Sequence, residues 1–520
     1  MTVALWIRRC AQRWPDKLAY VDGERRLTFG QFNERVNRQV HGLLAAGAVR
    51  GDRIATLTNN HVECVEAVAA AAKGGFVHVP INFRSVPREI AHVVDHCGAT
   101  IVLVEKEYAA KLADAGALRS VKRVITIDPG NPESDYERWL AGSDAAEPTV
   151  DVTGDDHFFI CYTSGATGTP KGVLHQQRQS VAHAPVVVVG YEFTRDTKVL
   201  LVYPHNSIAS INMFYVPAWL LGACVVFTDQ RNFNADRWLE LVERERITHS
   251  HLVPTMLFRV LESPRLRETD TRSIVTIGYG SAPMPTERIE RLQAAFGNVL
   301  IQGYGMTEVS SIAAYLDKQD HLEALRPGGD RARLNSCGRA AFGTELRVVD
   351  EHDRDVQPGE VGEIVFRGPQ VMTGYWNDPE KTAETLRNGW LHSGDMATLD
   401  ERGYLTIVDR KKDLIISGGA NISSREVEEA LYRHPAVKEA SVVGKPDEEW
   451  GELPHAFVSL HAGRSATAAE LIAFCRESLS GYKCPNSIDF LDELPKNALG
   501  KILKSDLRAR YWAAQGRQVN

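Results

Sequence analysis

The hydrophobic residues in the N-terminal part of the chain follow the periods of helices and strands in alternation. Apolar side chains recur at every fourth position from Phe32 to Leu44, and this spacing predicts an amphipathic helix with Thr28 as its N-cap. Helical segments then alternate with short apolar runs that are typical of strands, at residues 53–58, 76–80 and 100–105. Because strands joined through helices pair in parallel, the pattern predicts a parallel sheet covered by helices.

A second series of strand-like runs follows a polar loop at residues 162–172 and shows the same alternation. Helix-like sequence such as residues 235–246 separates most of these runs, which lie at residues 198–203, 223–227, 249–253, 273–279 and 299–305. After about residue 335, the runs at 345–350, 362–368 and 404–410 are separated by Gly, Pro and Asp with little helical sequence. The chain is therefore predicted to contain two doubly wound α/β layers and a small, mainly antiparallel β unit.

A junction between two domains is predicted near Asp409. The mixed-charge run 409–413 is followed by a Gly-Gly turn and by a capping-box helix start at Ser423. The remainder of the chain has strand and helix patterns of its own. We therefore predict an N-terminal domain over residues 1–409 and a C-terminal α+β domain over residues 410–520, with a hinge near 409–413.

The composition is that of an ordinary globular protein, with 43% hydrophobic and 24% charged residues among 520. The 60 Lys and Arg against 67 Asp and Glu give a net charge of -7, so no basic excess points to nucleic acid as a partner. The eight cysteines are scattered without a CxxC pair, which predicts free thiols in a reducing compartment. Arg8, Arg9 and Arg13 interrupt the apolar run that a signal peptide needs, and no stretch approaches about 18 apolar residues, so we expect a cytoplasmic protein without a transmembrane segment.

The segment YTSGATGTPKG at residues 162–172 has the residue types of a phosphate-binding loop. Ser, Thr and Gly provide hydroxyls and backbone N–H groups around a concavity, and Lys171 adds a positive charge. The loop follows the apolar run 157–162, as expected for a loop that leaves a buried strand. Because Gly172 follows Lys171, the segment is not the GxxxxGK[ST] motif, and a P-loop kinase that releases ADP is disfavoured.

Four further motifs follow this loop along the chain, namely QGYGMTE at 302–308, LHSGD at 391–395, DRKKD at 409–413 and PKNALGKILK at 495–504. Together the five motifs make the chain resemble the adenylate-forming enzymes, the superfamily of acyl-CoA synthetases, firefly luciferase and peptide-synthetase adenylation domains, over essentially its whole length. The resemblance implies a large N-terminal domain of two doubly wound α/β subdomains and a small β-barrel-like subdomain, followed by a small mobile C-terminal domain. Within the superfamily, the chain is most similar to bacterial fatty-acyl-CoA and aryl-CoA (feruloyl-type) ligases.

The resemblance implies that the protein activates a carboxylate with ATP and Mg²⁺. Attack of a carboxylate on the α-phosphate brings two anions together, so positive charge and hydrogen-bond donors must dominate the site. Glu308 would coordinate Mg²⁺ and Thr307 would contact the α-phosphate. The residues that would hold the β- and γ-phosphates are Thr163, Ser164, Gly165, Thr167, Gly168 and Lys171.

The nucleoside-binding residues are likewise implied by the resemblance. Tyr304 would stack on adenine, Asp395 would accept hydrogen bonds from both ribose hydroxyls, and Arg410 would join it at the ribose or phosphate. The other residues of the nucleotide site would be Gly280, Ser281, Ala282, Pro283, Gln302, Gly303 and Gly305.

Two lysines and a glycine pair are assigned to the catalytic cycle by the same resemblance. Lys501, which follows Gly500, would reach the carboxylate and the α-phosphate and stabilise charge in the adenylation transition state. Lys412 would be the hinge about which the C-terminal domain rotates before thioester formation, at an exposed position that tolerates a large φ/ψ change. Gly418 and Gly419 would line the pantetheine tunnel of CoA, where the lack of a Cβ permits close approach.

The acyl group is predicted to be hydrophobic, either a medium or long fatty chain or an aromatic acid. Relatives that activate amino acids carry an Asp in the segment that corresponds to residues 203–210, and YPHNSIAS has no acidic residue there. Ser207 stands where many acyl-CoA synthetases carry a His, and His205 two residues earlier leaves the gating role open. The candidate pocket residues are Tyr203, Ser207, Ile208, Met213, Phe214, Tyr279 and Met306.

We therefore predict an acyl-CoA synthetase that converts a carboxylic acid and ATP to acyl-AMP and pyrophosphate, and then acyl-AMP and CoA to acyl-CoA and AMP. The alternatives are a ligase that loads its acyl group onto a carrier protein, and a non-catalytic protein that binds an adenylate. A homodimer is left open. His249 and His251 share one face of a predicted strand without a third ligand in view, so a zinc site is disfavoured.

Overall fold

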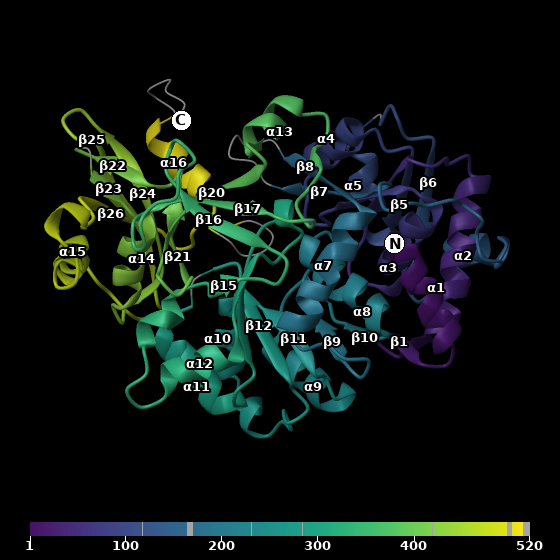
Figure 1. Ribbon diagram of the computed structural model, residues 1–520, viewed down its shortest axis with the longest axis horizontal. Coiled ribbons are helices and arrows are strands. Elements are labelled where there is room, and N and C mark those ends of the chain that lie inside the picture. The colour runs from purple at the N-terminus through teal and green to yellow at the C-terminus, as the bar shows by residue number, and fades with distance from the viewer. Residues whose placement is uncertain are drawn as a thin grey trace. The chain divides into compact units, whose positions relative to one another are not determined.

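The protein is described from a computed structural model, shown in Figure 1. The structure describes residues 1–116, 118–163, 170–229, 231–282, 284–418, 420–496 and 502–512. The chain separates into two compact units, the first containing Met1–Gly165, Thr169–Leu346 and Phe366–Leu391, and the second containing Arg347–Val365 and His392–Asn520. The domain boundary expected near Asp409 stays a prediction.

The first unit contains a seven-stranded sheet with the strand order β18-β8-β7-β4-β3-β5-β6. Its strands are β3 (Arg53–Leu57), β4 (Val77–Ile81), β5 (Ile101–Glu105), β6 (Arg123–Ile127), β7 (His157–Thr163), β8 (Lys171–Gln176) and β18 (Gly374–Tyr375). The strands from β7 to β6 pair in parallel, whereas β8 pairs antiparallel with β7 and with β18. Their crossovers contain α3 (Val62–Gly74), α4 (Pro87–Cys97), α5 (Ala109–Ala113) and α6 (Asp135–Ala141).

A nine-stranded sheet completes the framework of the first unit, in the order β15-β14-β13-β12-β11-β9-β10-β1-β2. Its strands are β1 (Leu18–Asp22), β2 (Arg25–Thr28), β9 (Lys198–Leu201), β10 (Cys224–Phe227), β11 (His249–Leu252), β12 (Thr276–Gly280), β13 (Leu300–Tyr304), β14 (Ala314–Leu316) and β15 (Arg339–Ala340). The strands from β13 to β1 pair in parallel, and β2, β14 and β15 add antiparallel edges. The predicted second α/β layer is therefore confirmed.

Helices cover both sheets of the first unit, and α3 contacts β1 of one sheet as well as β3, β4 and β7 of the other (Figure 1). The remaining helices of the unit are α1 (Val3–Arg13), α2 (Phe29–Ala45), α7 (Gln177–Gly190), the π-helix η2 (Ser210–Tyr215), α8 (Val216–Leu221), α9 (Ala235–Glu245), α10 (Pro254–Glu262), α11 (Thr286–Phe296), α12 (Lys318–Leu325) and α13 (Pro379–Thr385). The predicted N-cap of α2 is confirmed, because the Thr28 hydroxyl accepts a hydrogen bond from the Gln31 amide. Leu44 was expected on the apolar face of this helix, but it is 37% exposed in the last turn.

A five-stranded sheet follows in the chain, as the Gly-, Pro- and Asp-rich sequence after residue 335 predicts. It consists of β16 (Glu345–Val349), β17 (Gly362–Arg367), β19 (Leu386–Arg387), β20 (Trp390–Leu399) and β21 (Leu405–Arg410). Strand β20 pairs antiparallel with β19 and with β21. The LHSGD motif lies in β20, and the DRKKD motif begins with the last two residues of β21.

The C-terminal part of the second unit is an α+β fold with its own core. Its strands are β22 (Ile415–Ser417), β23 (Ala420–Ile422), β24 (Val437–Asp447), β25 (Gly451–Leu460) and β26 (Ser487–Phe490), and its helices are α14 (Ser424–Tyr432), α15 (Ala468–Arg476) and α16 (Lys504–Trp512). Ile415, Val442 and Leu471 meet in an apolar cluster between the helices and the sheet. Ser423 caps α14 as predicted, because its hydroxyl accepts a hydrogen bond from the Glu426 amide at 3.2 Å.

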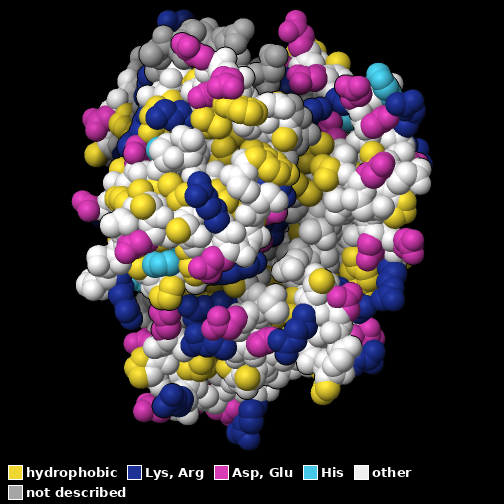
Figure 2. Space-filling view, turned by 90° about the vertical axis from the view of Figure 1, so that its left-hand side faces the viewer, with side chains coloured by type: hydrophobic (Ala, Val, Ile, Leu, Met, Phe, Trp, Pro, Cys, Tyr) yellow, Lys and Arg dark blue, Asp and Glu magenta, His cyan; other side chains and the backbone are white. Residues whose placement is uncertain are grey.

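The surface and the thiols add little to the functional picture. All eight cysteines are unpaired and buried. Figure 2 shows basic and acidic side chains mixed on the face that it draws, so no field of one sign is visible there. In the part of the chain that the structure describes, no helix has the length and apolar character needed to cross a bilayer. The cytoplasmic location stays a prediction.

We expect a pH dependence of stability from His61, which lies between two carboxylates at the start of α3. Its Nδ1 is 3.6 Å from Asp22 Oδ2 and its Nε2 is 3.7 Å from Glu105 Oε1. Burial alone would lower the pKa of His61, but the attraction between the protonated ring and these two carboxylates raises it to about 10. The folded state therefore keeps a proton that the unfolded state loses above pH 6.5, so the stabilisation is complete below that pH and disappears as the pH rises towards 10.

The measurement is the free energy of unfolding in denaturant at several pH values for the wild type and for His61→Gln. Because one pKa unit corresponds to about 1.4 kcal/mol, we expect the difference between the two proteins to shrink by about 2–4 kcal/mol between pH 6.5 and 10. A difference that does not change over this range would contradict the assignment.

Candidate active site

The two ends of the predicted phosphate loop lie side by side in the first unit. Thr163 ends β7 and Lys171 begins β8, and the two residues are direct partners in the antiparallel pair. The Lys171 ammonium lies 5.7 Å from the centre of the Tyr375 ring, and partial burial lowers the pKa of the lysine. Several predicted site residues lie outside the described residues: Ser164, Gly165, Thr167, Gly168, Pro283, Gly419 and Lys501.

Tyr375 contacts both Lys171 and Glu308. The Tyr375 hydroxyl donates a hydrogen bond to Glu308 Oε1 at 2.8 Å, and only 8% of Glu308 is exposed. Burial and the nearby Glu308 charge raise the pKa of Tyr375, so its hydroxyl remains a donor. Lys171, Tyr375 and Glu308 come from distant parts of the sequence, yet they form one cluster of a cation, a hydroxyl and a carboxylate.

The turn that carries Thr307 and Glu308 is the 3₁₀ segment η4 (Thr307–Val309), and it is held by buried polar contacts. His175 Nε2 donates to the Thr307 carbonyl oxygen at 2.9 Å, and burial lowers the pKa of His175 to about 4, so the ring is neutral. The backbone just after the turn is unusual, because Ser310 and Ser311 have φ of 65° and 119°. A Cβ on Gly305 would collide with the Ser311 carbonyl oxygen, so this tight path requires glycine.

The two predicted nucleoside-binding segments lie on neighbouring parallel strands. Gly280 at the end of β12 is the direct partner of Gly303 in β13, and a Cβ on Gly280 would collide with the Gly303 carbonyl oxygen. Ser281 follows in the left-handed region with φ of 66°. The Tyr304 ring lies 6.1 Å from the Phe366 ring and is only partly buried. The structure thus brings residues 280–282 and 302–305 together at the carboxyl ends of two strands, a common location for ligand sites.

In the second unit, the structure brings Asp395 and Arg410 together. They are direct partners in the pairing of β20 with β21, and Arg410 Nε lies 3.4 Å from Asp395 Oδ1. Lys412 is partly buried rather than exposed, and this burial lowers its pKa. Gly418 has φ of 55°, and a Cβ there would collide with the Trp450 ring. The hinge role of Lys412 and the tunnel role of Gly418 stay predictions.

The candidate acyl-pocket residues differ in burial. Tyr203, Met213, Phe214 and Tyr279 are buried, whereas Ser207, Ile208 and Met306 are partly exposed. The Tyr203 and Phe214 rings lie 6.5 Å apart, and the Tyr279 hydroxyl is 2.8 Å from His321 Nε2. These contacts bring Tyr203 and Phe214 together, while the Tyr279 hydroxyl is held by His321 of α12.

The structure shows the contacts of three histidines that the sequence raised as candidates: His205, His249 and His251. His205 is 1% exposed and its Nε2 lies 3.1 Å from Thr56 Oγ1, so it belongs to a buried polar network. His249 Nε2 is 2.9 Å from the Tyr191 carbonyl oxygen, and His251 Nδ1 is 3.0 Å from the Tyr203 hydroxyl. Within the described ranges, no three His, Cys, Asp or Glu side chains gather in a way that could hold a metal ion.

Sequence reasoning missed Tyr375 and His175, which position the turn of Glu308. Tyr375 lies in the run TGYWNDP at residues 373–379, where a Gly before two aromatic residues was the only available signal. His175 lies four residues after Lys171, inside an apolar strand, and nothing local connects it with Thr307. Both contacts require the pairing of distant segments.

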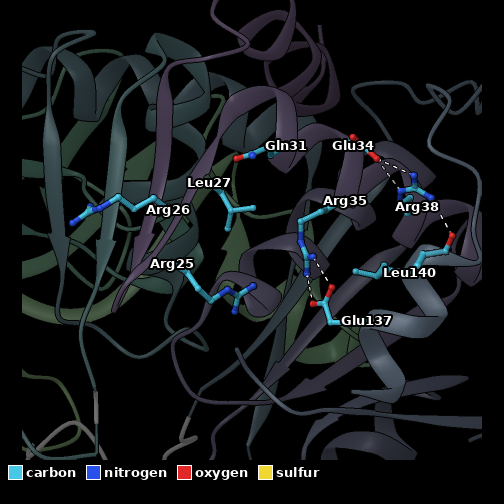
Figure 3. Close-up of a pocket in the computed structure, with 10 residues that line it drawn as sticks. Arg25, Arg26, Leu27, Gln31, Glu34, Arg35, Arg38, Glu137 and Leu140 are labelled. Carbon is cyan, nitrogen blue, oxygen red and sulfur yellow. Dashed lines mark hydrogen bonds and ion pairs between the residues drawn. The ribbon is translucent and has the colours of Figure 1, made fainter. Parts of the chain in front are cut away.

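A cavity of about 620 Å³ lies elsewhere in the first unit, among Arg25, Arg26, Arg35 and Arg38 (Figure 3). Arg35 faces Glu137 in Figure 3, with an ion pair at 2.7 Å. The other three arginines are paired with Glu63, Glu245 and Glu34 at 2.7, 2.9 and 2.8 Å. Because each guanidinium already has a carboxylate partner, this cavity lacks the excess positive charge of a phosphate site.

Comparisons with known proteins agree with the fold and the motifs. The family described as AMP-binding enzyme matches residues 7–376, and the AMP-binding enzyme C-terminal domain matches residues 426–501. The chain therefore belongs to the AMP-binding enzyme family, and the predicted adenylate-forming superfamily is confirmed. The prediction that the protein is an enzyme of this family, with a large N-terminal and a small C-terminal domain, is also confirmed.

Similar proteins include CoA ligases of aromatic and fatty acids. The chain is 37% identical to a feruloyl-CoA synthase from an Amycolatopsis species over 506 residues, which cover 97% of this chain and 98% of that protein. The solved structure of a Mycobacterium tuberculosis fatty acyl CoA synthetase is similar with a TM-score of 0.78 and 31% identity, and 99% of each chain is covered. ATP-bound MatB from Rhodopseudomonas palustris has a TM-score of 0.88 and 28% identity, covering 98% of this chain and 99% of that one.

Proposed function

We propose that the protein is an ATP-dependent carboxylate–CoA ligase. In the first half-reaction, a carboxylate oxygen attacks the α-phosphorus of ATP, the bond to the β-phosphate oxygen breaks, and acyl-AMP and pyrophosphate form. In the second, the CoA sulfur attacks the acyl carbon, AMP leaves, and the thiol proton is released. Full-length similarity to a feruloyl-CoA synthase and to a fatty acyl CoA synthetase supports this proposal.

The cluster of Lys171, Tyr375 and Glu308 is the observation that carries the proposal. A polyphosphate needs positive charge near its oxygens, and the Lys171 ammonium lies 5.7 Å from the Tyr375 ring beside the predicted loop. Glu308 is held by a 2.8 Å hydrogen bond from Tyr375, so its position is fixed before any ligand enters. The geometry fits a site in which a cation and a carboxylate-bound metal share the charge of the phosphates.

The donor set at Glu308 fits Mg²⁺. This ion prefers oxygen ligands and is usually held by one or two carboxylates together with phosphate oxygens and waters. When bound, Mg²⁺ would supply charge neutralisation of the phosphates. Tyr375 would keep one carboxylate oxygen oriented, and His175 would hold the turn through the Thr307 carbonyl oxygen.

We propose that residues of the sequence motifs bind the nucleoside. Tyr304 would stack on adenine beside Gly280, where the absence of a Cβ lets β12 lie close to the Gly303 carbonyl oxygen. Asp395 and Arg410 would bind the ribose and a phosphate, and their 3.4 Å contact fits two groups that share one ligand. Thr163 and the loop residues after it would donate to the β- and γ-phosphates.

The acid is proposed to be hydrophobic, because Tyr203, Met213 and Phe214 provide apolar and aromatic surface. A ligase that transfers its acyl group to a carrier protein is the rival within the enzymes, and it would form acyl-AMP without a CoA thioester. A non-catalytic adenylate binder would bind nucleotide without releasing pyrophosphate.

The deciding experiment measures pyrophosphate release with ATP and Mg²⁺ over a panel of acids, each with and without CoA. The panel runs from acetate through octanoate and palmitate to benzoate and cinnamates. We expect one class of hydrophobic acids to support release, and sustained turnover only with CoA. Release that CoA does not accelerate would indicate a carrier-protein acceptor, and nucleotide binding without any release would contradict the enzyme.

A further inference from the structure

We propose that Asn60 is a positioning residue for the acid, because its side chain holds the backbone of the acyl segment (residues 203–210) at Tyr203 and His205. Thr56 assists it through the His205 ring. This inference rests on the proposed function, since it concerns the acid that the same site takes. It goes further because recognition of the acid then depends on β3 and the loop after it, which supply none of the candidate pocket residues.

The contact joins the two sheets of the first unit. The acyl segment follows β9 of the nine-stranded sheet, whereas Asn60 follows β3 of the seven-stranded sheet. Each of these strands pairs in parallel with a neighbour on both sides, and each loop leaves the carboxyl end of its strand. Ligands of parallel sheets bind outside the carboxyl ends of the strands. A contact between the two loops therefore fixes one ligand-binding edge against the other.

Asn60 uses both polar atoms of its side chain on the acyl segment. Its Nδ2 donates to the Tyr203 carbonyl oxygen at 2.7 Å, and its Oδ1 accepts from the His205 amide at 2.7 Å. These two hydrogen bonds form the Asn60 clamp, and they fix which way the side-chain amide points, because a carbonyl oxygen needs a donor and an N–H needs an acceptor. Only 3% of Asn60 is exposed, so its loss would remove partners from buried backbone groups.

The His205 ring gives the acyl segment a second attachment to the same part of the fold. Its Nε2 lies 3.1 Å from Thr56 Oγ1 in β3, and the same hydroxyl lies 3.0 Å from His78 Nε2 in β4. Burial lowers the pKa of both histidines, so both rings are neutral, and the hydroxyl can donate to one ring and accept from the other. His205, whose gating role the sequence left open, is therefore an anchor of the segment.

The loop that carries Asn60 is itself held in place. The Asn60 amide donates to Asn59 Oδ1 at 2.8 Å, and the Asn59 amide donates to Glu105 Oε2 at the end of β5 at 2.7 Å. Asn59 Nδ2 donates to Asp229 Oδ1, two residues after β10, at 3.2 Å. The Asn60 clamp therefore starts from a fixed point, so it positions the acyl segment before the acid enters.

The acyl segment connects the Asn60 clamp with the candidate pocket residues. Tyr203 is one of these residues, and Ser207 and Ile208 follow His205 closely in the chain. The Ser207 amide donates to the Pro204 carbonyl oxygen at 2.9 Å, so the clamped residues and Ser207 belong to one turn. A shift of the backbone at 203–205 would move this turn and change the contacts of the acid. The predicted phosphate site lies on other elements, namely β7, β8 and η4.

The test measures steady-state pyrophosphate release in the presence of CoA by the full-length wild type and Asn60→Ala, with the acid and ATP varied separately. Octanoate, palmitate, benzoate and cinnamate are used in turn, and each acid that the wild type accepts is compared. We expect Asn60→Ala to raise KM for the acid by about tenfold, because two buried hydrogen bonds that position the segment are lost. KM for ATP should change by less than about twofold and kcat by less than about threefold, since other elements hold the phosphates.

Thr56→Val keeps the test valid if Asn60→Ala does not fold. Valine has nearly the shape of threonine and is favoured in strands, so it removes the hydroxyl at the His205 ring with little change in packing. We expect this variant to raise KM for the acid by at least about threefold, again with KM for ATP within about twofold of the wild type.

Asn37→Ala is the matched control. Asn37 is a buried asparagine of α2 whose Nδ2 donates to the Ala145 carbonyl oxygen at 2.9 Å, so alanine removes a similar contact with the backbone of a distant segment. This variant should lose stability as Asn60→Ala does, but it should keep the wild-type KM for the acid. Thermal unfolding of all three variants shows whether each is folded.

Three outcomes would overturn the inference while the proposed function stands. The first is a wild-type KM for the acid in whichever of Asn60→Ala and Thr56→Val folds. The second is a rise in KM for ATP as large as the rise for the acid, and the third is an equal rise for the acid in Asn37→Ala, because either would mean a general loosening of the fold. If no acid of the wider panel supports pyrophosphate release by the wild type, the proposed function itself is overturned, and the role of Asn60 with it.

Discussion

Lys501→Ala should reduce the rate of acyl-AMP formation by about 10²–10³-fold, because it removes a positive charge from the transition state of the first half-reaction. Attack of the carboxylate on the α-phosphate concentrates negative charge between two groups that are already anionic. A single preorganised donor in such a site contributes about 3–4 kcal/mol to the barrier. The second half-reaction releases AMP and needs no such charge, so transfer from supplied acyl-AMP to CoA should be largely retained.

Pyrophosphate release in single turnover measures the first half-reaction, and acyl-CoA formation from synthetic acyl-AMP measures the second. Two neighbouring lysines serve as controls for the register of the motif. Lys496 Nζ lies 2.6 Å from Glu439, and Lys504 Nζ lies 2.8 Å from Glu428. Because both already have carboxylate partners within the second unit, their alanine variants should affect stability more than adenylation. Equal loss of both half-reactions in Lys501→Ala, or a larger adenylation defect in either control, would contradict the assignment.

The sequence predicts most of the framework because the relevant signals are local. Thr28 is the N-cap that the helical pattern predicts, and Ser423 caps its helix as the capping-box spacing indicates. Lys171 follows the loop at the start of a strand. Helix caps and apolar alternation depend on residues within one or two turns, so they can be read without tertiary contacts. The five motifs add the order in which the parts of the site occur along the chain.

The second layer of the site could not be predicted in this way. Tyr375 reaches Glu308 only because β18 pairs with β8, and His175 reaches the Thr307 carbonyl oxygen although the two residues are 132 positions apart in the sequence. The strand pattern of His251 indicates that it shares a face with His249, but it does not say which side chains cover that face. Register and cross-strand neighbours are set by the whole sheet.

The burial of Lys412 in the second unit could not be predicted from the sequence either. A charged run at a domain junction is expected to be solvated, yet Lys412 is partly buried. The neighbouring Asp413 carboxylate lies 2.9 Å from Arg508 in α16, a residue far along the chain. This long-range ion pair draws the run against α16, and no local pattern indicates it.

Lys412→Pro should spare pyrophosphate release and reduce thioester formation by about 100-fold, because it fixes the backbone where rotation is needed between the two half-reactions. Proline holds φ near −65° and also restricts the residue before it to extended conformations. The amides of Lys411 and Asp413 donate to the carbonyl oxygens of Gly394 and Arg410, and a proline at 412 keeps both donors. The change therefore acts on the backbone freedom of residues 411 and 412.

Lys412→Ala separates this effect from loss of the charge, since alanine removes the ammonium and keeps the backbone free. We expect the alanine variant to perform both half-reactions at close to wild-type rates, measured as pyrophosphate release in single turnover and as acyl-CoA formation from supplied acyl-AMP. If the proline variant forms acyl-CoA as fast as the alanine variant, residue 412 is not the hinge. If proline instead abolishes pyrophosphate release, the backbone here serves adenylation, and the conformational change between the half-reactions must occur at another position.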